Sequence, residues 1–437
     1  MEFEFPDRDR LEATNDAEPS DLPRAYRVSC TRNQPTVQDV TAASVDAVTD
    51  IPELADLEPG SSVAITAGSR GIDILPEVLE AIVSELQSRG LKPFVFPAMG
   101  SHGGATPEGQ RETLATLGIT PDRLGCEIRS SLAVEAVGTD STGRQVYAAE
   151  DALGADAVLL VNRIKLHTDF RGDVESGLCK MAVVGLGKQH GADNMHNAAL
   201  ERGFHEVIPE WAGILVEETP IVGGVGIIEN ADEQAAEIHG LPAADLLEAE
   251  PALLERSKEF FPELPVEDLD LLVVDEMGKE ISGTGLDTNV IGRVRFHNQA
   301  EVDEPSLTRV YVRSLTPASH GNSLGMGLAD LVHRDLASTV DFEDTYVNIV
   351  TSGEPNRAKL PFVVPSDTTA FVLSASMTGV ASPSDLRIAR IKSTMEPGEL
   401  WVSEPVAEEL ADRDDIHVHE DSPWLFDEHG ELEMSWD

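Results

Sequence analysis

The sequence predicts an α/β protein with two α/β domains, mostly parallel sheets and an active-site cleft between the domains. Two observations predict this class. Short, continuous apolar runs alternate with amphipathic helical stretches, and the alternation begins again in the second half of the chain. A chain of 437 residues is long for one hydrophobic core and sufficient for two.

The first domain is predicted from three strands and the helices between them. Ser62–Thr66, Pro93–Pro97 and Ala157–Asn162 are apolar runs typical of strands buried on both faces. Asp73–Arg89 has the pattern of an amphipathic helix, and another helix is expected to open near Thr106. Strands that alternate with helices in this way form parallel sheets with right-handed crossovers.

The second domain is predicted after Phe261–Asp268, because the two prolines and the acidic residues of that stretch are typical of a linker. Leu269–Asp275 (LDLLVVD) then starts a new strand, and the segment 395–404 is a candidate return crossing. Residues 1–25 are charged and contain proline, which favours a loosely held arm.

These boundaries give an N-terminal cofactor-binding domain over residues 1–266 and a C-terminal α/β domain over residues 267–401. The acidic tail, residues 402–437, still carries aromatic side chains, so we expect it to pack back on the N-terminal domain.

The charge is strongly negative. The chain has 79 acidic and 32 basic residues, and its formal net charge is −47. The acidic residues recur along the whole chain, which favours a halophilic surface on which salt screens self-repulsion. An acidic surface for a partner protein is the alternative. Nucleic acid is not an expected partner, because no basic stripe is present to neutralise phosphates.

The cysteines and the hydropathy pattern predict a soluble, cytoplasmic protein without membrane attachment. Cys30, Cys126 and Cys179 form no CxxC pair, so neither a disulfide framework nor a structural zinc site is expected. The acidic N-terminus lacks the apolar segment of a signal peptide, and no apolar run is long enough to span a membrane.

Two glycine-containing loops at strand ends are candidate binding sites. TAGSRGI (Thr66–Ile72) offers small residues, the hydroxyl of Ser69, the guanidinium of Arg70 and an open backbone at Gly71. GSHGGATPE (100–108) places His102 among glycines, which favours a ring near a ligand. The alternatives are a plain left-handed turn with a surface arginine and a structural histidine.

A third candidate is the stretch from Lys165 to His196. Three of the eight lysines of the chain fall within residues 165–188. Lys180 lies between apolar residues, where a solvated charge is costly, so pairing or chemical use is expected. A chance cluster on a solvated helix is the alternative. Zinc-protease spacing of the HExxH kind is absent.

A fourth candidate follows the first strand of the second domain. Its polar side chains could reach across a cleft to hold a substrate carboxylate, and they are Lys279, Asp287, Asn289 and Arg293. A glycine-rich surface loop is the alternative.

With these four motifs in this order, the chain resembles the nickel-pincer nucleotide lactate racemase family. The resemblance covers most of the chain, from about residue 60 to beyond residue 290. It rests on TAGSRG, GSHGGATPEG, KLH, SGLCK and the histidine that follows them. Ala67 stands where the family has an aspartate, and the segment between KLH and SGLCK is longer than in lactate racemase. The substrate therefore stays undetermined.

The resemblance implies a cofactor, a pyridinium-3,5-bisthiocarboxylate mononucleotide that holds Ni(II), and roles for individual residues. His102 and His167 match the pair that acts as general acid and base, and Arg70 matches an arginine of the phosphate and substrate loop. Lys180 matches the lysine that anchors the pincer, and His196 matches the nickel ligand. Further expected contacts are Ser69, Gly71, Gly177 and Lys188 for the cofactor and Asn289 and Arg293 for the substrate.

The function so implied is racemisation or epimerisation of a small 2-hydroxy acid, lactate-like or a sugar acid, by reversible hydride transfer. Soft sulfur and carbon donors with one imidazole suit square-planar Ni(II). Alternatives are a nicotinamide-type oxidoreductase, although the chain has no GxGxxG fingerprint, and a non-catalytic protein that binds the nucleotide. A homodimer is compatible with the sequence, which does not fix the oligomeric state.

Overall fold

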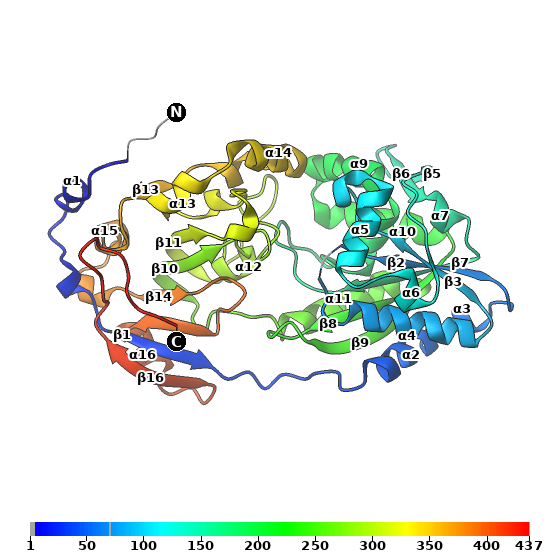
Figure 1. The fold of residues 1–437 in the computed structure, drawn as a ribbon, viewed down its shortest axis with the longest axis horizontal. Coiled ribbons are helices and arrows are strands. Elements are labelled where there is room, and N and C mark those ends of the chain that lie inside the picture. The colour runs from blue at the N-terminus through cyan, green and yellow to red at the C-terminus, as the bar shows by residue number, and fades with distance from the viewer. Residues whose placement is uncertain (1–4, 70, 437) are drawn as a thin grey trace. The chain divides into compact units, whose positions relative to one another are not determined.

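The computed structural model describes residues 5–69 and 71–436. The chain divides into two compact units. One unit runs from Gln34 to Phe261, and the other combines the chain up to Asn33 with the chain from Pro262 onward. Each unit has its own sheet, which can be followed by label in Figure 1. The α/β class with mainly parallel sheets that the sequence predicts is therefore confirmed.

The unit 34–261 is built on a six-stranded sheet of order β4-β3-β2-β7-β8-β9, in which only the β8–β9 pair is antiparallel. The strands are β2 (Ser62–Ala67), β3 (Lys92–Pro97), β4 (Glu127–Ile128), β7 (Ala157–Arg163), β8 (Ile221–Glu229) and β9 (Ala235–Pro242), and a separate hairpin joins β5 (Val134–Thr139) to β6 (Gln145–Ala149). Continuous burial of β2, β3 and β7 explains their unbroken apolar sequences.

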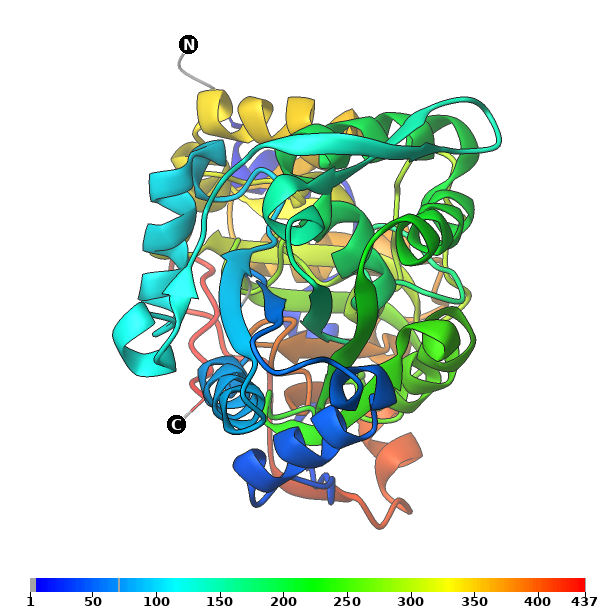
Figure 2. The same cartoon turned by 90° about the vertical axis from the view of Figure 1, so that its right-hand side faces the viewer.

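Helices cover both faces of this sheet (Figure 2). They are α2 (Val40–Thr49), α3 (Pro52–Ala55), α4 (Leu75–Ser88), α5 (Pro107–Thr116), α6 (Pro121–Leu124), α7 (Glu150–Leu153), α8 (Leu178–Lys180), α9 (Lys188–Arg202), α10 (Phe204–Glu218) and α11 (Leu246–Lys258). The apolar side of α4 packs with α2 and the strands into one core. The start expected for α5 is confirmed, since the Thr106 hydroxyl accepts a hydrogen bond from Gly109 N (3.1 Å) and Pro107 follows it.

The other unit is built on an eight-stranded sheet of order β13-β12-β11-β10-β14-β15-β1-β16. Its strands are β1 (Ala25–Cys30), β10 (Asp268–Met277), β11 (Ser306–Leu315), β12 (Leu331–His333), β13 (Phe362–Val364), β14 (Ile388–Ile391), β15 (Glu399–Ser403) and β16 (Ile416–Ser422). The five from β13 to β14 are parallel, and the last three pair antiparallel.

The helices of this unit are α1 (Arg8–Glu12), α12 (Thr288–Ile291), α13 (Arg334–Thr339), α14 (Phe342–Ser352), α15 (Asp367–Met377) and α16 (Glu404–Leu410). Across both units, none of the described helices is long and apolar enough to cross a membrane.

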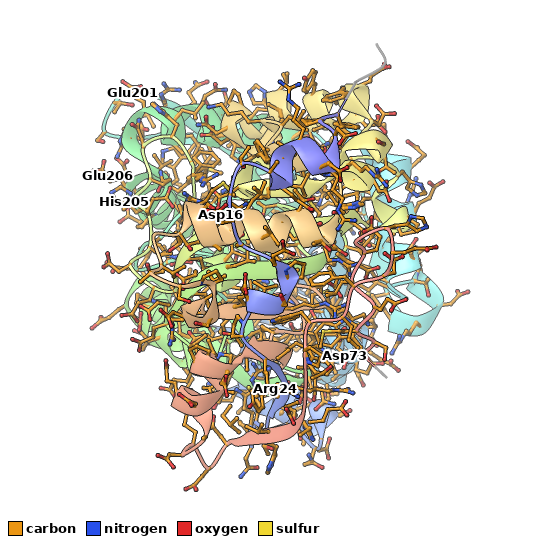
Figure 3. The ribbon with its side chains drawn as sticks, turned by 90° about the vertical axis from the view of Figure 1, so that its left-hand side faces the viewer. Asp16, Arg24, Asp73, Glu201, His205 and Glu206 are labelled. Atoms are coloured by element: carbon orange, nitrogen blue, oxygen red, sulfur yellow. The ribbon has the colours of Figure 1, made fainter. Side chains whose placement is uncertain are left out.

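The N-terminal segment is not the loose arm that its composition predicts. β1 lies between β15 and β16 in the sheet, and the Glu12 carboxylate accepts a hydrogen bond from the Thr369 hydroxyl (2.8 Å) on α15. Figure 3 shows the blue N-terminal helix beside the orange α15. The residues before Asn33 therefore belong with the second half of the chain, because strand pairing completes their backbone hydrogen bonds.

The C-terminal tail also packs in this unit, whereas the sequence predicts that it returns to the domain formed by residues 1–266. Its β16 pairs with β1, and Trp424 packs against Phe371 in the core. Further along, the Trp436 indole donates to Asp275 (2.8 Å), and Leu432 N donates to Asp367 (2.8 Å). These buried polar partners hold the tail on the eight-stranded sheet.

Candidate functional site

The candidate site lies at the carboxyl ends of β2, β3 and β7 in the unit 34–261. β2 lies between the other two strands, and the sheet grows outward from it in both directions. The pair β2–β7 is thus the point at which the strand order reverses, which is the usual ligand position in open α/β sheets. The three loops that follow these strands carry the histidines and small residues that the sequence indicates.

The loop after β2 reaches the histidine of the loop after β3. The Ser69 hydroxyl forms a hydrogen bond with Nδ1 of His102. Gly71 is exposed, and a Cβ at this position would meet no atom within 4 Å, so the backbone here is open to a ligand. Arg70 lies outside the described residues.

The loop after β3 holds His102 exposed on a turn made by glycines. Gly100, Gly103 and Gly104 have φ values of +58°, +66° and +64°, a region that side chains disfavour. Gln110, fully buried on α5, donates to the carbonyls of Gly100 (3.1 Å) and His102 (3.3 Å). Gln110 therefore fixes the turn from its buried side, and the His102 imidazole stays accessible to solvent.

The loop after β7 fixes His167 through its backbone. The buried Glu175 carboxylate accepts a hydrogen bond from His167 N (2.6 Å), and the Arg171 guanidinium donates to the His167 carbonyl (2.6 Å). The imidazole packs on Phe170, with ring centroids 4.5 Å apart. Main chain and ring are thus both held in place.

Lys180 and His196 lie on consecutive helical segments after this loop, and a left-handed Lys188 (φ +52°) separates the π-helix from the rest of the last segment. Lys180 ends α8, a π-helix occupies Met181–Leu186, and α9 carries His196. π-Helical segments occur frequently at functional sites. The Lys180 amine contacts Nε2 of His167. The rings of His167 and His196 both lie next to Phe204, at centroid distances of 6.5 Å and 5.9 Å.

The electrostatics of His196 favour an uncharged ring. Burial lowers its pKa, because desolvation disfavours the charged imidazolium. A neutral imidazole keeps a lone pair, which is the form that binds metal ions.

The three loops and the π-helix pack closely against each other. A Cβ on Gly100 would lie 3.3 Å from Val184 of the π-helix, and one on Gly185 would lie 2.9 Å from the Cβ of Ala98. On the other side, a Cβ on Gly68 would lie 3.4 Å from Met181. The site residues of this unit are therefore gathered at one end of the sheet.

A buried carboxyl beside the start of α8 is a feature that the sequence analysis did not single out. Glu250 on α11 is fully buried, and one of its oxygens accepts a hydrogen bond from Cys179 N (2.8 Å). The other oxygen has no hydrogen-bond partner among the described residues. A Cβ on Gly177 would lie 2.0 Å from this oxygen. The backbone of Gly177 is extended, a conformation that any residue can adopt. Glycine is therefore required here because Glu250 occupies the space that a Cβ would need.

A sequence signal for Glu250 exists. The buried positions of α11 are Leu246, Glu250, Leu254 and Ser257, and this spacing places a charged residue on the apolar face of the helix. From β7, Asn162 Nδ2 donates to the Gly177 carbonyl (2.9 Å), so Gly177 is held on two sides.

Lys188 links two elements of this unit, and the cofactor contact expected for it stays a prediction. Its side chain is fully buried, and its amine donates to the Pro97 carbonyl (2.5 Å) above the ring of Phe96. Burial lowers the pKa of Lys188 to about 8. The lysine therefore ties the start of α9 to the end of β3.

Arg293 and Asn289 belong to the other unit. The Arg293 guanidinium donates to the carbonyls of Leu328 (3.0 Å) and Leu307 (2.8 Å) and pairs with Asp330 (2.7 Å). These partners give Arg293 a structural role in its unit, and the substrate contact expected for it stays a prediction. Asn289 is half-buried near the start of α12, where its side-chain amide donates to Asp287 (2.7 Å).

Glu250→Gln should change how stability depends on pH. Burial raises the pKa of Glu250 from 4.5 to about 7, so the folded protein binds this proton more tightly than the unfolded chain does. Its contribution to stability is present below pH 4.5 and is lost as the pH rises to about 7. The loss is about 3 kcal/mol. Gln cannot ionise, so denaturant unfolding at pH 5 and pH 8 should show a smaller decline for Glu250→Gln than for the wild type.

Glu248→Gln is the matched control, because Glu248 is exposed on the same helix. Its decline should equal that of the wild type. A Glu250→Gln variant with an unchanged pH dependence would show that the carboxyl is ionised throughout this range.

The residues of this site could bind a metal ion whose other ligands come from a bound cofactor. Within residues 5–69 and 71–436, no three His, Cys, Asp or Glu side chains are grouped to hold an ion by themselves. His196 offers an imidazole whose pKa is lowered by burial, and Lys180 ends the helical segment before the π-helix that leads to α9. One imidazole could complete the coordination of a square-planar ion whose other donors come from a bound group.

Comparison with known proteins supports the fold. No family model matches the chain, and no curated protein matches it in sequence. Among solved structures, the chain is similar to the lactate racemase apoprotein from Thermoanaerobacterium thermosaccharolyticum, with a TM-score of 0.52 and 11% identity. The match covers 87% of this chain and 96% of that one. At this identity the likeness is one of fold.

Proposed function

We propose that this chain is a racemase or epimerase of a small 2-hydroxy acid, lactate-like or a sugar acid, that works with a nickel-pincer nucleotide. One observation carries the proposal. His102, His167, Lys180 and His196 come from separate segments and gather at the carboxyl end of one sheet, beside its topological switch point. The fold likeness to a lactate racemase apoprotein agrees with it.

The cofactor would be held by residues of the unit 34–261. His196 supplies a neutral imidazole for the nickel ion, and Lys180 supplies an amine next to it. The open loop at Ser69 and Gly71 suits the phosphate and ribose, since small residues let the backbone approach. When bound, such a group supplies a reversible hydride acceptor for the carbinol carbon of the substrate.

The chain itself would handle the proton of the substrate hydroxyl. His102 and His167 are the candidate groups, because imidazoles exchange protons near neutral pH. His102 is exposed and held by Ser69, while His167 is held by Glu175 and Arg171. Arg70, which follows Ser69 in the sequence, is proposed to bind the substrate carboxylate.

A labelled substrate tests this function. Single enantiomers of 2-hydroxy acids that carry deuterium on the carbinol carbon are incubated with the nickel-loaded protein. We expect one acid to racemise or epimerise and to keep its deuterium, because a hydride returned to the same molecule does not exchange with water. Exchange of the label for solvent hydrogen would indicate proton abstraction from carbon, and the absence of turnover with every acid would reject the proposal.

A further inference from the structure

His167 has both ring nitrogens in defined contacts. The backbone N–H of Asp169 donates a hydrogen bond to Nδ1 (2.9 Å), and Nε2 contacts the amine of Lys180. Phe170 packs against the ring, and Glu175 and Arg171 fix the backbone of His167, so the ring is held where both contacts form.

These two contacts determine where the imidazole proton lies. A neutral imidazole carries one N–H and one lone pair. Because a backbone N–H points at Nδ1, the lone pair must be there, and the hydrogen must be on Nε2. A protonated imidazolium would instead direct an Nδ1–H against the N–H of Asp169. The Asp169 carboxylate lies 3.8 Å from Nδ1, which is too far for a hydrogen bond.

The same reasoning applies to Lys180. If Nε2 carries the hydrogen, it donates toward the lysine nitrogen, and that nitrogen must accept with a lone pair. An ammonium group has no lone pair, since all its positions are donors. The contact between Lys180 and His167 therefore requires an uncharged amine.

His102 differs from His167 in this respect. Its Nδ1 faces the hydroxyl of Ser69, and a hydroxyl can either donate or accept a hydrogen bond. His102 can therefore carry its proton on either nitrogen, whereas a backbone N–H allows His167 only one arrangement.

We propose that His167 and Lys180 form a neutral imidazole–amine pair, in which Asp169 N holds His167 as a hydrogen-bond donor and Lys180 is an uncharged nucleophilic amine. Because Lys180 accepts the one N–H of His167 in this pair, we assign the hydroxyl proton of the substrate to His102, an assignment that rests on the proposed function. The neutral donor role of an imidazole that accepts from the backbone is known chemistry for enzymes.

An aldehyde probe tests the state of Lys180 in the full chain without nickel. With glyoxylate and cyanoborohydride, an amine forms a C–N bond to the aldehyde carbon, the carbonyl oxygen leaves as water with both amine protons, and the imine is reduced by hydride. An ordinary lysine is uncharged in only about one of 2,500 molecules at pH 7. Peptide mass spectrometry should show Lys180 labelled at least about tenfold faster than the exposed Lys92.

His167→Phe is the decisive variant, because it keeps a ring against Phe170 and removes the Nε2 hydrogen. We expect Lys180 labelling to fall to the rate of Lys92 or below. His190→Phe is the matched control, since the His190 ring lies on Tyr147 instead, and its Lys180 labelling should equal that of the wild type.

Nitrogen NMR of His167 gives a second readout. It should show a protonated Nε2 and an unprotonated Nδ1 at pH 7. A proton on Nδ1, or Lys180 labelling no faster than that of Lys92, would overturn the pair. Neither measurement involves nickel, so the pair can fail while the proposed function stands, and a chain that binds no nickel can still show the pair.

Discussion

His102→Gln should reduce turnover by about 10² to 10⁴-fold while nickel binding is retained, because a positioned proton-transfer group typically contributes a factor of this size. A glutamine amide can still hydrogen-bond to the Ser69 hydroxyl that holds His102, so the loop keeps its shape. It cannot take the hydroxyl proton of the substrate. Both kcat/KM for racemisation and the nickel content per chain should be measured on the same preparation.

His190→Gln serves as the control for this variant. His190 is exposed on α9 and packs on Tyr147, so its replacement should leave both quantities unchanged. Full activity in His102→Gln would show that proton transfer occurs elsewhere. Loss of nickel in the same variant would show that His102 belongs to the metal site.

Gly177→Ala should destabilise the protein by about 3 kcal/mol, an effect expected from overpacking together with a lost hydrogen bond to a carboxyl. The new Cβ would lie 2.0 Å from Glu250 Oε1 and 2.7 Å from its Cδ. Glu250 is fully buried, so its carboxyl can move away only by giving up the hydrogen bond from Cys179 N. Denaturant unfolding at constant pH measures the change.

A double-mutant cycle separates this contact from a general effect on the helix. In a Glu250→Ala background the space beside Gly177 is empty, and Gly177→Ala should then cost less than about 1 kcal/mol. An equal cost in both backgrounds would mean that Glu250 is not the reason for the glycine. Lys180 lies three residues after Gly177, so the coupling free energy from this cycle also reports on the packing next to the helix of Lys180.

The sequence predicts the strands of this site well because β2, β3 and β7 are buried on both faces, and such strands are continuous apolar runs. Because these strands are parallel, the loops with Ser69, His102 and His167 follow them at the same edge of the sheet. His196 is assigned from the resemblance, and its role as a nickel ligand stays a prediction.

Pairing between distant segments is less visible in a sequence. β1 is a short strand with polar residues, and its place between β15 and β16 depends on partners near the other end of the chain. The domain boundaries expected from composition therefore differ from the two compact units. The sequence also does not show which groups a charged side chain will contact. Arg293 and Lys188 donate hydrogen bonds to backbone carbonyls. Every residue has a carbonyl, so no sequence pattern marks these partners.

The most direct test of the account is the nickel content of protein produced together with enzymes that make the pincer nucleotide. We predict about one nickel ion per chain in the wild type, loss of nickel in His196→Ala and retention in His190→Ala. His190 lies on the same helix and packs on Tyr147, so it controls for removal of a histidine. A wild-type chain without nickel, or a His196→Ala chain that keeps it, would contradict the account.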